Sequence, residues 1–401
     1  MKRSFLHSLS LISCLTLLPF ALTACGDSGS GETDADTTDS DTSDSDGETA
    51  GGNDSDLGDA VSQECVDAMG QYAQFSAALG DGAGMLAAYE GTALQTYIQR
   101  LDGENGRTDD AQITAALADG GEQALIDAEL WVMHSVLEGL RSYVAAPEGG
   151  VEDPYNAMDD AHCIWEGSWK AAAQAAEGWS GDYTDLIVSD VDAGFLMGHD
   201  GLSGTPPAAS IDEWAILPFK QIVEKNQYRV IHRHVSHYAS MAQSGGDALA
   251  AHRALRWFEM YEHRLADRNT PGITIIKDML GGEPTTIDPA VILREMNVAF
   301  AKRTRTYASQ ALEGGEVGVP AGYKGSVEGS VYTTLLYPDM MAAGFDITSI
   351  DASWDGYNQA IRDDDTAAAQ THSDALVQAY CDYQEQTLGI ASCTGSDDEP
   401  G

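Results

Sequence analysis

Apolar residues recur at helical spacing through almost all of the chain after residue 60. Ala, Leu, Met, Glu and Gln are abundant there, and few β-branched runs alternate with polar residues as a half-buried strand requires. About 340 residues follow residue 60, which is enough for one large core or two smaller ones. The pattern therefore predicts an all-α fold, built as one helical bundle or as two packed bundles.

Two of the expected helices begin at clear capping signals. Asp153 precedes Pro154 and Asp288 precedes Pro289, so each carboxylate caps a helix whose first position is a proline. The predicted helices cover residues 63–79, 83–101, 109–118, 121–145, 154–178, 211–243, 246–268, 289–312 and 364–389.

Two polar, glycine-rich stretches, 198–210 and 313–330, predict long loops. The first contains the sequence Gly-Thr-Pro-Pro and is the expected boundary between an N-terminal helical part, residues 60–200, and a C-terminal helical part, residues 201–395. Long loops in compact domains are often functional, so we expect the second stretch to be a lid or a short hairpin.

Residues 26–59 cannot belong to either part. They are almost wholly Asp, Ser, Thr, Gly and Glu, with no Lys or Arg. Such a segment has no side chains with which to form a core, and its like charges repel one another. We expect residues 25–59 to be a disordered acidic linker.

The first 25 residues have the features of an export signal. Lys2 and Arg3 supply positive charge, a short apolar run follows, and residues 22–24 (Leu-Thr-Ala) lead directly to Cys25. This order resembles the lipobox of bacterial lipoproteins. The resemblance implies that residues 1–24 are a cleaved signal peptide and that acyl chains on Cys25 anchor the protein to a lipid bilayer.

The resemblance also implies a location. Gly26 follows the cysteine, where some bacterial lipoproteins carry an acidic retention signal. We therefore expect the bacterial outer membrane, with the protein facing the periplasm or the cell surface. No later apolar run approaches the roughly 20 residues that a membrane-spanning helix needs.

Four cysteines remain once Cys14 leaves with the signal and Cys25 is acylated. In an oxidising compartment four cysteines predict two disulfides, for which three pairings exist. Closeness in sequence favours one pair, and elimination leaves the other. The expected disulfides are Cys381 with Cys393 and Cys65 with Cys163.

Charge is unevenly distributed along the chain. The formal net charge is −43, which argues against a nucleic-acid partner. Nevertheless, 13 of the 21 Lys and Arg residues, but only nine Asp and Glu, lie between residues 220 and 305. This segment either supplies internal counter-charges to acidic neighbours or lines a site for an anionic or metal ligand.

Histidines of the same segment are candidate metal ligands. His234 and His237 fall on the apolar face of the predicted helix 211–243. A buried imidazole needs a partner, because burying an unpaired polar ring is costly. That partner is either a Tyr, Glu or backbone group or a metal ion.

The next predicted helix carries His252, Glu259 and His263 within about 40° of one another around its axis. Imidazole and carboxylate groups on one face suit iron, manganese or zinc. The alternative is a surface pair of Glu259 and His263 that stabilises the helix by a few tenths of a kcal/mol.

Two further pairs repeat the one-turn spacing and form a secondary set of candidate ligands. They are His134 with Glu138 and His162 with Glu166. Helix bundles build metal sites from such groups, although the Glu-x-x-His pattern typical of those sites is absent.

Three arginines are candidate contacts for an anion, because a guanidinium group binds carboxylates and phosphates with paired hydrogen bonds. Arg229 and Arg233 point away from the apolar face of their helix, as does His232, and Arg256 borders the stripe that contains Glu259. The ligand would then be a metal-bearing anion.

This set of residues resembles imelysin-like bacterial lipoproteins, helical bundles linked to iron uptake, in architecture only. The Gly-x-His-x-x-Glu motif of that family is absent, because Met197 and Leu202 occupy the required positions around His199. No residue role is therefore carried over from that family.

The sequence leaves three functional hypotheses. Motifs of serine hydrolases, zinc peptidases, kinases and dinucleotide-binding enzymes are absent, so no catalytic residue is assigned. The leading hypothesis is a lipid-anchored helical protein that binds a metal or a metal-bearing anion. The rival is a structural or protein-interaction lipoprotein without a ligand. An enzyme assembled from distant residues, such as a peptidase, is third.

Overall fold

A computed structural model describes residues 61–205 and 208–390 of the chain. The described residues form an all-α fold, as predicted, and one short hairpin is its only sheet within these ranges. The predicted signal peptide, the predicted lipidation site Cys25 and the predicted acidic linker all lie outside the described residues.

Most N-terminal helices agree with the predicted ranges, but some predicted helices are divided and α8 was not predicted. Residues 83–101 break at Gly91, whose φ of +72° ends one helix before the next begins. The elements are α1 (Gln63–Ala77), α2 (Gly82–Tyr89), α3 (Ala93–Asn105), α4 (Asp109–Asp119), α5 (Glu122–Ala145), α6 (Pro154–Ile164), the π-helix η1 (Trp165–Trp169), α7 (Lys170–Glu177) and α8 (Ile187–Asp200).

The C-terminal elements begin with the hairpin that occupies most of the predicted loop 198–210. Residues 246–268, predicted as one helix, form two. The elements are β1 (Leu202–Thr205), β2 (Ala208–Ile211), α9 (Glu213–Gly245), α10 (Ala248–Glu259), α11 (His263–Ala266), α12 (Thr270–Leu280), the 3-10 turn η2 (Pro284–Thr286), α13 (Pro289–Glu313), α14 (Pro320–Ala342), α15 (Ile347–Arg362) and α16 (Thr366–Gln386). The two strands pair antiparallel, with Leu202 opposite Ile211.

The expected capping carboxylates are confirmed. Asp153 accepts a hydrogen bond from the backbone N–H of Asn156 at 3.0 Å, and Asp288 accepts one from that of Ala290 at 3.0 Å. Each carboxylate satisfies an N–H group that has no partner within its own helix.

The prediction of a loop, lid or hairpin over residues 313–330 is wrong, because α14 begins at Pro320. Its glycines serve close packing between helices. A Cβ atom on Gly329 would lie 2.5 Å from the Trp354 ring and 2.6 Å from the Cβ of Tyr307. Side chains of neighbouring helices fill the space that a larger residue would need at Gly329, whereas Gly315 and Gly318, with φ of +66° and +85°, lie in the turn before α14.

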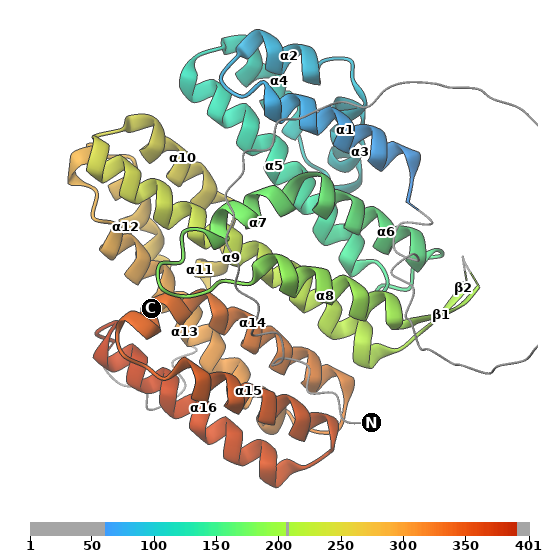
Figure 1. Ribbon diagram of the computed structural model, residues 1–401, viewed down its shortest axis with the longest axis vertical. Coiled ribbons are helices and arrows are strands. Elements are labelled where there is room, and N and C mark those ends of the chain that lie inside the picture. Colours follow the sequence, from blue (N-terminus) through green and yellow to red (C-terminus); the bar gives the residue numbers. More distant parts are fainter. Residues whose placement is uncertain (1–60, 206–207, 391–401) are drawn as a thin grey trace, which may run out of the picture. The chain divides into compact units, whose positions relative to one another are not determined.

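The longest helix, α9, runs between the N-terminal and C-terminal helices and packs against α5, α7, α8, α10, α13 and α14 (Figure 1). The main hydrophobic core extends from Cys65 to Leu388 and so contains residues from both predicted parts. A smaller cluster lies among α1 to α5 and includes Phe75, Tyr89 and Ile98. The division at residue 200 stays a prediction.

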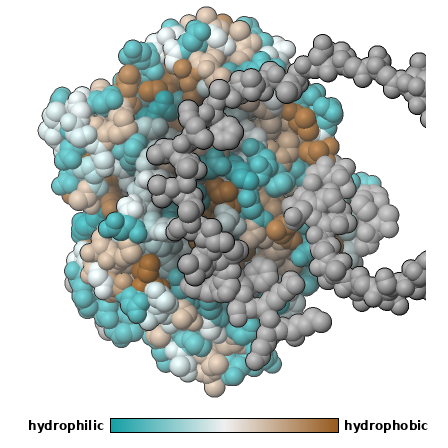
Figure 2. Space-filling view, viewed as in Figure 1, coloured by the Kyte–Doolittle hydropathy of each residue, from teal (hydrophilic) through white to brown (hydrophobic). Residues whose placement is uncertain are grey.

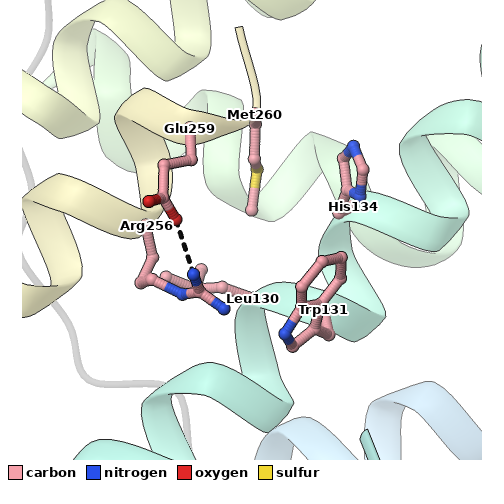
Figure 3. A pocket seen from close by; sticks show the side chains of 6 residues that line it. All are labelled: Leu130, Trp131, His134, Arg256, Glu259 and Met260. Atoms are coloured by element: carbon pink, nitrogen blue, oxygen red, sulfur yellow. Dashed lines mark hydrogen bonds and ion pairs between the residues drawn. The ribbon is translucent and has the colours of Figure 1, made fainter. Parts of the chain in front are cut away.

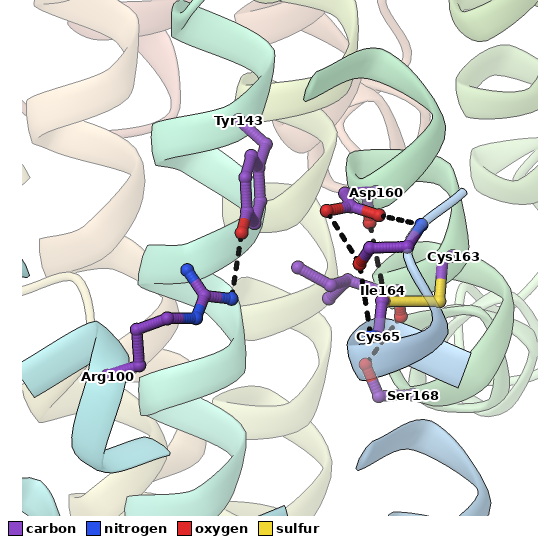
Figure 4. Close-up of a disulfide and its surroundings, with 8 residues drawn as sticks. Cys65, Arg100, Tyr143, Asp160, Cys163, Ile164 and Ser168 are labelled. Carbon is purple, nitrogen blue, oxygen red and sulfur yellow. Dashed lines mark hydrogen bonds between the residues drawn. A yellow bond between two sulfur atoms is a disulfide. The ribbon is translucent and has the colours of Figure 1, made fainter. Parts of the chain in front are cut away.

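The disulfide between Cys65 and Cys163 links α1 to α6, with the two Cα atoms 6.5 Å apart (Figure 4). Asp160, one turn before Cys163, accepts hydrogen bonds from the backbone N–H and the hydroxyl of Ser62 at 2.8 and 3.0 Å. The start of α1 is therefore held to α6 both covalently and by hydrogen bonds. The second predicted pair is not described, because Cys393 lies outside the described residues.

On the part of the surface that Figure 2 shows uncovered, hydrophilic residues predominate and apolar ones form separate spots among them. Large apolar side chains that are exposed, such as Leu79, Leu186 and Met241, come from separate elements. Within the described ranges, none of the helices is long and apolar enough to cross a membrane.

Candidate functional site

A pocket of about 520 Å³ lies where α1, α5 and α7 meet α9 and α10. Small side chains and one glycine leave the space open, and three aromatic rings and an ion pair border it. Its lining residues are Tyr72, Ala73, Ser76, Ala77, Glu129, Met133, Gly167, Ser168, Ala171, Ala172, His234, Tyr238, Arg253 and Trp257.

One wall of the pocket is the π-helical turn η1 between α6 and α7. Gly167 in this turn lets α1 approach closely, because a Cβ atom there would lie 2.5 Å from the Cβ of Met69. π-Helical turns are rare and occur frequently at functional sites. The disulfide partner Cys163 lies on α6 just before the turn, and Cys65 lies on α1, so the covalent link joins the pocket-lining helix α1 to the helix that leads into the turn.

The aromatic wall is held by stacking. The imidazole of His234 lies on the Trp257 ring, with centroids 4.0 Å apart and planes 19° apart. Trp169 meets the edge of Trp257 at 5.8 Å. His234 Nε2 donates to the carbonyl of Ala172 at 3.1 Å, which assigns the neutral tautomer. Burial lowers the pKa of His234 to about 3, so its ring is neutral near pH 7.

Two atoms of this wall have no hydrogen-bond partner among the described residues. They are Nδ1 of His234 and Nε1 of Trp257, and both are enclosed. An enclosed polar atom without a protein partner costs roughly 1–3 kcal/mol unless a water molecule or a ligand group pairs with it.

An ion pair crosses the pocket from α5 to α10. Glu129 Oε1 lies 2.6 Å from Arg253 Nη1, and the side chains are 16% and 21% exposed. The Arg253 guanidinium carbon stands 5.4 Å from the centroid of the Tyr238 ring. Burial raises the pKa of Tyr238, so its hydroxyl stays protonated near neutral pH.

A second, much smaller hollow of about 60 Å³ lies on the other side of the α5–α10 contact (Figure 3). Its lining residues are Leu130, Trp131, His134, Arg256, Glu259 and Met260, so the fold brings three predicted site residues together here. The Glu259 carboxylate accepts from Arg256 Nη1 at 2.5 Å, and Arg256 Nε lies 2.8 Å from Asp127. Glu259 is therefore already engaged by a guanidinium group.

The five primary metal candidates do not converge on one point among the described residues. His237 stacks on Trp179 at 3.8 Å, and His234 meets the same indole edge-on at 4.9 Å. His252 Nε2 lies 2.7 Å from Asp127. The His263 ring stands 6.3 Å from that of Tyr228, and burial lowers its pKa to about 4.

No group of three or more His, Cys, Asp or Glu side chains among residues 61–205 and 208–390 is arranged to hold a metal ion. The indole ring of Trp179 and the carboxylate of Asp127 contact the imidazoles that were expected to converge. Binding of iron, manganese or zinc therefore has no support from this geometry.

The secondary metal candidates are also occupied. His134 Nδ1 lies 2.9 Å from Arg107 Nη2, and Glu138 pairs with Arg141. Burial, followed by the positive charge of Arg107, lowers the pKa of His134 to about 4. His162 Nε2 lies 3.6 Å from Glu166, which also accepts from Lys170 at 2.6 Å.

The predicted anion contacts Arg229 and Arg233 lie in the interior and share Asp185. Arg229 also contacts Asp190 at 2.7 Å, and Arg233 donates to the carbonyl of Leu335 at 3.0 Å. The expectation that these arginines face away from the core is wrong, because α9 has neighbours on every side. Their charges are compensated by the protein's own carboxylates.

Sequence reasoning missed the residues that define the larger pocket, above all Glu129, Arg253 and Tyr238. Arg253 and Trp257 lie one helical turn apart, which indicates a shared face. That spacing is common on any helix, and the partner residue Glu129 is 124 positions away. Only the fold brings them together.

Comparisons with protein-family models, curated proteins and solved structures find no match for this chain. The interpretation of the pocket therefore rests on its own geometry and chemistry.

Proposed function

We propose that this protein is an exported, lipid-anchored binding protein that holds a small organic ligand in the pocket between α1, α5, α7, α9 and α10. In this proposal Cys25 carries acyl chains in the bacterial outer membrane. The acidic segment 26–59 keeps the helical body away from the bilayer, facing the periplasm or the cell surface.

The observation that carries the proposal is the pocket itself. Its volume of about 520 Å³ falls within the roughly 300–1,000 Å³ typical of small-molecule sites. Such sites combine apolar and aromatic walls with a few polar groups that orient the ligand, and they occur preferentially between structural units. Trp257 and Tyr238 supply aromatic walls here, and Glu129 and Arg253 supply the polar groups.

Ligand binding is tested on the full-length protein by a melting-temperature screen against small organic compounds, with iron, manganese and zinc salts as a separate arm. A true ligand raises the melting temperature, because it binds the folded state alone. The substitution Ala73→Trp fills the pocket and should abolish the shift, whereas Gln74→Trp, on the same helix but outside the lining, should keep it.

The outcomes separate the three hypotheses. A shift that survives Ala73→Trp, or no shift with any compound, would overturn the binding proposal and leave a structural or interaction lipoprotein. Stoichiometric metal in the purified protein would instead restore the metal hypothesis. Conversion of an added compound to a product would support the hypothesis that the protein is an enzyme.

The membrane anchor is tested separately in bacterial cells. The wild-type protein should incorporate labelled palmitate and sediment with outer membranes, and Cys25→Ala should do neither. Membrane association of Cys25→Ala equal to that of the wild type would contradict the anchor.

A further inference from the structure

The lining of the pocket contains one carboxylate and one guanidinium group, those of Glu129 and Arg253. The other titratable groups of the lining are uncharged near neutral pH. Burial lowers the pKa of His234 to about 3 and raises the pKa values of Tyr72 and Tyr238 above their usual value. The pocket therefore carries two opposite charges and no net charge.

Both charged groups retain unused hydrogen-bonding capacity. Their direct contact joins Nη1 of Arg253 to one oxygen of Glu129 at 2.6 Å. A guanidinium group has five N–H donors, and a carboxylate accepts at about four lone-pair positions. Since both side chains line the pocket and are partly exposed, each can bind a ligand group while keeping contact with the other.

The aromatic rings of the lining help to orient Arg253 and add apolar surface for a ligand. The ring of Tyr238 supports the Arg253 guanidinium at 5.4 Å, which limits the directions in which this group can present its donors. The Trp257 ring is covered on one face by His234 and is 3% exposed, so the part of it that borders the pocket adds a limited apolar surface for an aliphatic or aromatic substituent. The small residues Ala73, Ala77 and Ala172 leave room for it.

A ligand with a single charge fits this lining poorly. It would neutralise one member of the ion pair and leave the other partly enclosed without compensation, which is costly. A ligand with both charges forms two ion pairs and buries no net charge.

We infer that the ligand is a zwitterion of the free amino-acid type, whose carboxylate binds Arg253, whose ammonium group binds Glu129 and whose side chain lies against Trp257. This inference rests on the proposed function, because it specifies the chemistry of the ligand in the same pocket.

The first test measures binding of the twenty common free L-amino acids to the full-length protein by calorimetry, with the N-acetyl and carboxamide derivatives of each. At least one free amino acid should bind, and both of its derivatives should bind about tenfold more weakly or worse, because each lacks one charge. The inference is overturned if the derivatives bind as tightly as the free amino acid. It is also overturned if none of the twenty free amino acids binds.

The second test removes the two charges of the pocket one at a time and measures the effect on ligand preference. Glu129→Gln should weaken binding of the free amino acid. It should also make the affinity for the free amino acid no higher than that for the N-acetyl derivative, which has no ammonium group. Arg253→Gln should make the affinity for the free amino acid no higher than that for its carboxamide derivative. Glu262→Gln is the matched control, because it removes the carboxylate of a 2.7 Å ion pair with Lys277 outside the lining and should change neither ratio.

Circular dichroism and melting temperature establish that each variant is folded. If both pocket variants weaken all three probes by the same factor, the charges do not select the ligand and the inference fails. If another class of compound binds in a manner sensitive to Ala73→Trp, the proposed function holds and only the zwitterion inference is lost. If no compound binds, both fail.

Discussion

Two groups of ion pairs in this protein use the same kinds of side chain but differ in how far they are enclosed. In the interior, Asp185 is 0% exposed and contacts Arg229 and Arg233, whose side chains are 1% and 6% exposed. At the pocket, Glu129 and Arg253 form a single pair that remains partly open to solvent.

The difference teaches which charged residues are available to a ligand. Arg233 also donates to Ser180 and to the carbonyls of Thr334 and Leu335 at 3.0–3.3 Å, so its guanidinium group is surrounded by protein acceptors. Burial alone would raise the pKa of Asp185, but the two arginines outweigh burial and hold it below its usual value. The interior group maintains the fold, whereas the pocket pair retains capacity for a ligand.

The largest effect should come from breaking the interior group with Asp185→Asn. This change leaves two buried guanidinium groups without a shared carboxylate and should lower the free energy of unfolding by about 3–5 kcal/mol. Urea denaturation measures it. The exposed control Asp182→Asn should stay within about 0.5 kcal/mol of the wild type. A loss below about 1 kcal/mol for Asp185→Asn would show that enclosure does not distinguish the two groups.

A smaller effect should arise at the buried edge of the pocket, where His234 titrates. Its pKa is about 3 in the folded protein and about 6.5 in an unfolded chain, so below pH 6.5 the unfolded chain takes up a proton that the folded protein does not. Stability therefore falls as the pH falls through this window. Between pH 6.5 and pH 5, the free energy of unfolding of His234→Phe should therefore fall by about 1.5 kcal/mol less than that of the wild type.

Unfolding curves at a series of pH values measure this contribution. His237→Phe is the control, because burial lowers the pKa of His237 in the same direction but its side chain is partly exposed. An unchanged pH dependence in His234→Phe would contradict the neutral, enclosed imidazole.

The smallest effect on stability should come from the pocket pair itself. Glu129→Gln should change the free energy of unfolding by about 0–1 kcal/mol, because partly exposed ion pairs contribute little. The same urea experiment measures it. If Glu129→Gln lowered the free energy of unfolding as much as Asp185→Asn does, the pocket pair would also maintain the fold. The two groups of ion pairs would then not differ in role.

Local patterns were sufficient for many helices of the fold. The carboxylate and proline at the starts of α6 and α13 act within one helical turn, so their effect can be predicted without knowing the neighbours. The 3.6-residue spacing of apolar side chains gave α5 and α9 nearly correct limits for the same reason. Counting cysteines left three pairings, and the disulfide between Cys65 and Cys163 agrees with the one favoured by the closeness of Cys381 to Cys393 and by elimination.

The same local logic failed where packing decides conformation. Glycines in α14 were interpreted as loop residues, although Gly329 is required by the approach of Trp354 and Tyr307. On α9, His234 was correctly expected to be buried, whereas His232 was placed off the apolar face of the helix. The helix is surrounded, so His232 is buried as well and contacts Asn297 at 3.0 Å.

By itself, the sequence determined the helical character of the body, its caps and the cysteines available to pair, because spacing, capping and counting act over a few residues or over composition. It also predicts a lipid anchor at Cys25, which stays a prediction. Only the tertiary structure decided which charges meet, since Glu129 and Arg253 are 124 positions apart and Asp185 lies far along the chain from Arg233. Whether a side chain is compensated by the protein or left open to a ligand depends on neighbours that come together only in the folded chain.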